Sequence, residues 1–136
     1  MLLMASASLD LVRSIYAAWE RGDYGSVDWA HPEIEFVIAD GIEPGSWTGL
    51  AGMAAAWRPR LSAWEEVRVE AEEYRELDEE RVLVFYQARG RGKTSGLDLE
   101  QIRTKGANVF YVRGDKVTRL VVYNDATRAI ADLRYL

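Results

Sequence analysis

Residues 104–124, TKGANVFYVRGDKVTRLVVYN, decide the fold class of this chain. Two stretches of alternating apolar residues, 97–113 and 117–124, flank the turn-forming pair Gly114-Asp115. That pattern predicts two antiparallel strands joined by a tight turn, with Gly106 marking a bulge in the first strand. Since side chains alternate between the faces of a strand, Asn108, Phe110 and Val112 should share the inner face.

The second strand places its own amide in a similar setting. Leu120, Val122 and Asn124 share one face, so each strand carries one carboxamide on an otherwise apolar surface. A buried amide without partners costs about 1–3 kcal/mol. Two interpretations stay open: each amide bonds backbone or water at a strand end, or both orient an oxygen atom of a ligand.

Upstream of this hairpin, the pattern separates helices from strands. Apolar residues at three- and four-residue spacing predict helices at 8–21, 24–29 and 50–64, with Ser8 and Gly22 as caps of the first. Pro59 should break the third helix near Arg58. Further strands are expected at 33–38, 67–76 and 81–89, a loop at 41–49, and a terminal helix at 127–133. The order favours an α+β layer.

Size and composition restrict the class of protein. The chain has 136 residues, which we expect to form one domain, residues 1–136. A net charge of −5 argues against nucleic acid as a partner. The N-terminal apolar run is too short for a membrane span or a secretory signal, so we expect no membrane partner and a cytoplasmic location. The chain has no cysteine and one histidine, His31, which cannot form a metal site alone.

Four phrases resemble one known family. They are IYAAWERGD at 15–23, HPEIEF at 31–36, WTGLAG at 47–52 and VFYVRGDKV at 109–117. In this order they resemble the SnoaL-like (polyketide cyclase-like) branch of the NTF2-like superfamily. The resemblance implies a cone: a strongly curved, mostly antiparallel sheet wraps against N-terminal helices and encloses an apolar pocket, with no cofactor. It also implies a homodimer through the outer sheet face, where Val109, Tyr111, Val121 and Tyr123 would form an exposed patch.

Candidate site residues follow from this implied pocket. The catalytic sets of the ketosteroid isomerases, limonene epoxide hydrolases and scytalone dehydratases are incomplete here. The remaining acid/base candidates are Asp40 and Asp125, although Asp125 could instead cap the terminal helix and Asp40 could be solvated. The side chains expected to contact a ligand are Tyr16, Trp57, Asn108, Phe110, Val122 and Asn124.

Two functional hypotheses follow. The first is a protein that binds a small, mostly apolar, oxygen-bearing molecule and, if catalytic, performs cofactor-free cyclisation, isomerisation or dehydration. The second is a non-catalytic binding or dimerisation module. The absence of a complete known catalytic set favours the second, and the two amides favour ligand binding of some kind.

Overall fold

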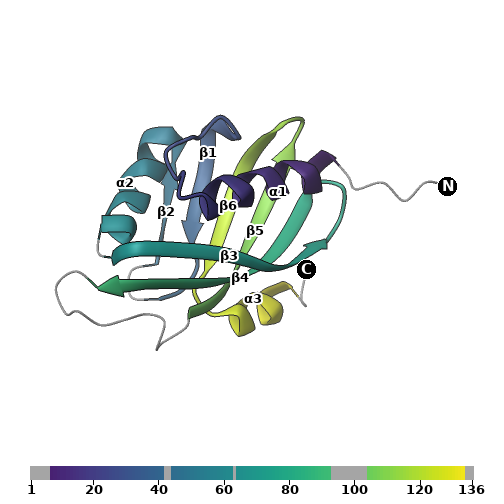
Figure 1. The fold of residues 1–136 in the computed structure, drawn as a ribbon. Coiled ribbons are helices and arrows are strands. Elements are labelled where there is room, and N and C mark those ends of the chain that lie inside the picture. The colour runs from purple at the N-terminus through teal and green to yellow at the C-terminus, as the bar shows by residue number, and fades with distance from the viewer. Residues whose placement is uncertain (1–6, 42–43, 63, 93–103, 134–136) are drawn as a thin grey trace.

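A single six-stranded sheet in the order β2-β1-β6-β5-β4-β3 forms the body of the protein. The computed structural model describes residues 7–41, 44–62, 64–92 and 104–133 (Figure 1). The strands are β1 (Ala30–Ile38), β2 (Gly45–Thr48), β3 (Trp64–Glu76), β4 (Arg81–Gly92), β5 (Thr104–Arg113) and β6 (Lys116–Tyr123). The helices are α1 (Ala7–Glu20), α2 (Gly49–Ser62) and α3 (Ala126–Leu133).

The sheet is mixed but mostly antiparallel. Every neighbouring pair is antiparallel except β1 and β6, in which Phe36 lies opposite Leu120 and Ile38 opposite Val122. The sheet turns so far that β3 and β4 lie across the direction of β1 and β6 (Figure 1). The predicted α+β class is confirmed.

Helix α1 packs on the inner face of the sheet. Its buried residues include Val12, Ile15, Tyr16 and Trp19, which recur at helical spacing and join the main core. The predicted C-terminal stop is confirmed: Gly22 has a φ of 86°, a conformation that glycine adopts without steric cost. Ser8 has another role than the predicted cap, since its hydroxyl donates to the carbonyl of Glu79.

The predicted face of β5 is also confirmed. Asn108, Phe110 and Val112 are buried on the side that faces α1. The bulge expected at Gly106 is not found, because Gly106 pairs with Tyr86 in unbroken register. A Cβ on Gly106 would lie 2.4 Å from the hydroxyl oxygen of Tyr86 and 2.4 Å from the carbonyl oxygen of Tyr123. The glycine therefore makes room for the Tyr86 side chain, whose hydroxyl donates to that carbonyl.

The segment between α1 and β1 differs from the prediction. No helix forms at 24–29; instead, the Asp23 carboxylate accepts the N–H groups of Gly25 and Ser26 and turns the chain. Aspartate competes with helical hydrogen bonding in this way. β1 starts at Ala30, three residues earlier than predicted.

The region around α2 also differs from the prediction. Residues 45–48, expected to be loop, form β2, because the β1 edge supplies its hydrogen-bonding partner. α2 continues through Pro59 to Ser62, so the predicted break near Arg58 is not found. Trp64, assigned to this helix, instead begins β3 and pairs with Gly92. Residues 97–103 of the predicted long strand lie outside the described residues.

The outer face of the sheet is not the exposed patch predicted. Val109, Val121 and Tyr123 are buried in a second cluster with Ala129 of α3, and Tyr111 is half-buried beside it. The Tyr123 hydroxyl donates to the Asp132 carboxylate across 3.0 Å, which ties α3 to β6. Homodimerisation through this face stays a prediction. Within the described ranges, the helices are too short or too polar to cross a membrane.

Candidate ligand-binding site

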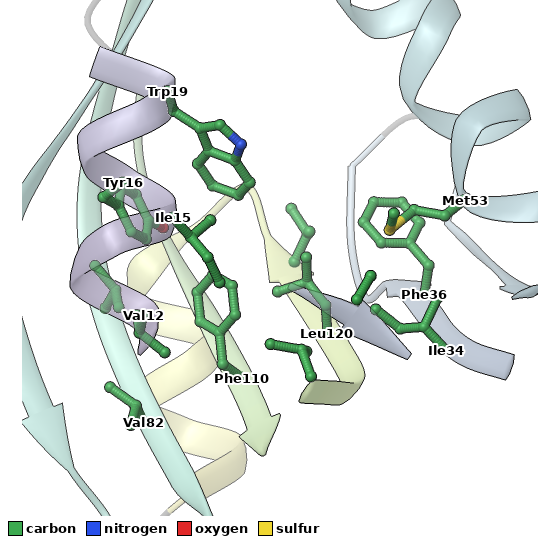
Figure 2. Packing of buried hydrophobic residues seen from close by; sticks show 14 of the residues in the cluster. Val12, Ile15, Tyr16, Trp19, Ile34, Phe36, Met53, Val82, Phe110 and Leu120 are labelled. Atoms are coloured by element: carbon green, nitrogen blue, oxygen red, sulfur yellow. The ribbon is translucent and has the colours of Figure 1, made fainter. Parts of the chain in front are cut away.

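A cavity of about 520 Å³ opens between α1, the 24–29 segment, α2 and the inner face of β1 and β6. Its volume falls within the range of small-molecule sites, roughly 300–1,000 Å³. Figure 2 shows Trp19 on one side, Phe36 and Met53 on the other, and Leu120 between them. The full lining is Trp19, Tyr24, Gly25, Val27, Trp29, Phe36, Leu50, Met53, Ala54, Trp57, Arg58 and Leu120.

Aromatic rings from four segments form one connected wall of this cavity. The ring centroids of Trp19 and Trp57 are 5.5 Å apart, and those of Phe36 and Trp57 are 5.7 Å apart at an interplanar angle of 84°. Trp29 meets Trp19 edge-on at 6.1 Å. Such pairs contribute about 0.5–1.5 kcal/mol each beyond area burial. The wall is therefore held in shape by the protein's own ring contacts.

One polar group inside the cavity lacks a partner. Trp19 is 3% exposed, and its indole N–H has no hydrogen-bond acceptor among the described residues. Its nitrogen lies on the side of the ring that faces Met53 and Phe36 (Figure 2). By contrast, the indole N–H of Trp29 donates to the Ser26 carbonyl. The Trp19 N–H is thus a donor available to a bound molecule.

Ionisable groups in the lining are few. Tyr24 has a raised pKa because it is partly buried, so it is neutral near pH 7. Arg58 is exposed at the edge of the cavity and is the one formally charged residue among the described lining residues. No carboxylate or imidazole belongs to that set.

The predicted ligand contacts Tyr16 and Asn108 are paired with each other behind the cavity. The Asn108 Nδ2 donates to the Tyr16 hydroxyl across 2.6 Å, and both residues are buried. Burial raises the pKa of Tyr16 well above its usual value, although the Asn108 contact opposes this. The Asn108 Oδ1 has no partner among the described residues. Neither residue belongs to the cavity lining.

The Asp40 carboxylate joins the end of β1 to the end of β6. Its Oδ1 accepts the N–H of Asn124 at 2.6 Å, and its Oδ2 accepts the N–H of Asp125 at 3.1 Å. The Asn124 side chain returns a hydrogen bond from its Nδ2 to the Asp40 carbonyl. These contacts occupy both carboxylate oxygens with backbone donors, away from the cavity lining.

Asp125 caps the N-terminus of α3, as one of the two predicted interpretations proposed. Its Oδ1 accepts the N–H of Thr127 at 2.9 Å, at the start of α3. Its carboxylate is exposed and is not in the lining. Neither acid/base candidate therefore lies in the cavity.

Of the six predicted ligand contacts, the cavity includes Trp57. Phe110 and Val122 are buried in the core instead. Sequence reasoning missed most of the lining, above all Tyr24, Val27 and Trp29. The available signal was the density of aromatic residues in a short segment with Gly22 and Gly25, which disfavour a helix.

No set of three or more metal-ligating side chains gathers in the part of the chain that the structure describes.

A model of the SnoaL-like domain matches residues 12–120. The chain belongs to the SnoaL-like family. This family lies within the NTF2-like superfamily, which agrees with the resemblance predicted from the four phrases. No curated protein sequence matches this SnoaL-like chain.

Solved structures similar to this SnoaL-like domain cover nearly its whole length. An NTF2-like protein of unknown function from Burkholderia pseudomallei has 21% identity and a TM-score of 0.75, covering 93% of this chain and 97% of its own. TerC, co-crystallised with polyporic acid, has 22% identity and a TM-score of 0.73, covering 96% and 100%. A candidate polyketide cyclase from Xanthomonas campestris has 21% identity and a TM-score of 0.67, covering 92% and 95%. At these identities the likeness shows a shared fold.

Proposed function

We propose that this protein binds a small, mostly apolar, oxygen-bearing molecule in the cavity between α1 and α2. The observation that carries the proposal is an apolar, ring-lined space whose wall includes an unpaired donor, the indole N–H of Trp19. Apolar pockets with a few well-placed polar groups are typical of small-molecule sites. A ligand oxygen at the Trp19 N–H would satisfy that donor and fix the ligand's orientation.

Two proteins of similar structure support this proposal. TerC has the same fold and was crystallised with the small molecule polyporic acid. The Xanthomonas protein is described as a candidate polyketide cyclase. Both names concern chains that handle small organic molecules, which agrees with a binding function for this cavity.

The chemistry of the lining favours binding without proton transfer. Its described residues include no carboxylate or imidazole that could act as general base, and Asp40 and Asp125 are engaged elsewhere. A catalytic base must come within hydrogen-bond reach of the proton that it removes. These observations favour a non-catalytic binding function.

The binding function can be tested by a substitution on α2 that places a larger side chain in the cavity. Ala54 lines the cavity and its neighbour Ala55 is exposed outside the lining, so Ala54→Phe and Ala55→Phe form a matched pair. The probe is N-phenyl-1-naphthylamine, an uncharged dye that fluoresces in apolar surroundings. We expect the wild type and Ala55→Phe to bind it alike, and Ala54→Phe to lose at least ten-fold in affinity. Equal binding by both variants, or no binding by the wild type, would contradict the proposal.

The role of the Trp19 N–H has its own test. Trp19→Phe keeps an aromatic ring but removes the donor, and 2-acetylnaphthalene and 2-ethylnaphthalene differ mainly in one carbonyl oxygen. The wild type should prefer the ketone, and Trp19→Phe should lose that preference. An unchanged preference in the variant would exclude the Trp19 donor as the anchor.

A further inference from the structure

One residue of the otherwise apolar cavity lining, Arg58, carries a positive charge. Arg58 lies on α2, one residue after Trp57; it belongs to the cavity lining and is exposed to solvent. It has no ion-pair or hydrogen-bond partner among the described residues. A guanidinium in this position offers up to five N–H donors to an anionic oxygen group.

We propose that the ligand is an aromatic acid, with its rings against the Trp19–Trp57 wall and its anionic group at Arg58. This inference rests on the proposed binding function and names the ligand class. The placement is favourable on physical grounds, because an anion at the edge keeps part of its hydration, whereas a charge deep in the apolar wall would not. Arginine also matches a carboxylate in planar, two-pronged geometry.

A cationic ligand is the main chemical alternative. Aromatic walls can hold quaternary ammonium groups through cation–π attraction. In this cavity the described lining holds no carboxylate to assist a cation, and Arg58 would repel it. The overall charge of −5 does not attract an acid from a distance, so the Arg58 contact must act at short range.

Three naphthalene probes separate these cases: 2-naphthoate, its neutral isostere 2-naphthamide and the cationic (2-naphthylmethyl)trimethylammonium. Binding is measured by titration calorimetry at low ionic strength for the wild type, Arg58→Met and the control Arg128→Met. Arg128 lies on α3 and carries the same charge outside the lining. We expect the wild type to prefer naphthoate over naphthamide by about three- to ten-fold, a modest ratio that suits a partly exposed ion pair.

Arg58→Met should abolish that preference, and Arg128→Met should keep it. Raising the salt concentration should shrink the preference in the wild type. Equal binding of naphthoate and naphthamide by the wild type would overturn the acid assignment while leaving the binding function intact. Tighter binding of the ammonium probe would do the same in favour of a cation. Failure of all three probes to bind would overturn both proposals.

Discussion

The side-chain amide of Asn108 on β5 donates a 2.6 Å hydrogen bond to the hydroxyl of Tyr16 on α1, across 92 positions of sequence. This contact links helix to sheet inside an apolar core that includes Phe110, whose ring meets Tyr16 edge-on at 5.9 Å. It satisfies one end of the amide, while the Asn108 Oδ1 remains unpaired among the described residues. Turning the amide by 180° would only exchange which end is left without a partner.

That imbalance predicts an unusual mutational pattern. Tyr16→Phe would leave both ends of the Asn108 amide unsatisfied and should lower the free energy of unfolding by about 1–3 kcal/mol. Adding Asn108→Leu to that variant should restore most of the loss, because two apolar partners replace two polar ones. Urea unfolding of the wild type, both single variants and the double variant measures this coupling. Strictly additive losses would show that the two side chains act independently.

Alkaline pH should weaken the fold through buried tyrosines, Tyr16 and Tyr123 among them. Burial raises the pKa of Tyr16, and burial together with the hydrogen bond to Asp132 raises the pKa of Tyr123 to about 12. In the unfolded chain both ionise near pH 10. Because the folded values are raised, their contribution to stability is complete below pH 10 and is lost as pH rises towards the folded values.

We therefore expect the free energy of unfolding to fall between about pH 10 and pH 12. Urea titrations followed by far-UV circular dichroism at several pH values would measure the slope. Tyr123→Phe should make the fall less steep, because one group that takes part in it is removed. A slope identical to that of the wild type would refute the assignment to Tyr123.

We expect Asp40 to stabilise the fold and to take no part in ligand binding. Asp40→Asn keeps the shape but leaves one oxygen to accept two backbone N–H groups, so we expect a loss of about 1–3 kcal/mol in stability. Binding of N-phenyl-1-naphthylamine to the folded variant should match the wild type, since Asp40 is not in the cavity lining. Loss of dye binding without loss of stability would instead place Asp40 in the site.

The same substitution should destabilise the protein at one glycine and have almost no effect at another. Gly106→Ala forces a methyl group to within 2.4 Å of a backbone carbonyl oxygen and of the Tyr86 hydroxyl, and should cost several kcal/mol. Gly25→Ala meets nothing within 4 Å and should leave the urea midpoint almost unchanged. Comparable stability of the two variants would contradict the close packing around Gly106.

Much of the fold was predictable because its signals are local. The alternation around Asn108 and Phe110, the turn at Gly114 and the helical spacing of Val12 to Trp19 depend on near neighbours alone. β2 was not predictable, since its four residues become a strand by pairing with β1. The helix assigned to 24–29 failed because the Asp23 side chain offers the backbone a competing turn.

The site was less predictable for a similar reason. The roles of Asp40 and Asn124 depend on a contact across 84 positions, which no local pattern contains. The cavity lining depends on how α2 packs against β1, which the sequence does not state. Trp57 could be predicted as a ligand contact because it is a large aromatic residue on a helix. Met53 and Leu50 could not be distinguished from ordinary core residues. Arg58 gave no periodic signal at all.

The parallel pairing of β1 with β6 has a consequence for folding during synthesis on the ribosome. Asp40 must wait for Asn124, 84 positions later, and at roughly 5–20 residues per second a ribosome needs about 4–17 seconds to make that stretch. Throughout that interval the nascent β1 lacks the neighbour that will flank it in the finished sheet. Molecular chaperones could therefore bind the unpaired edge of β1 before β6 is available to cover it.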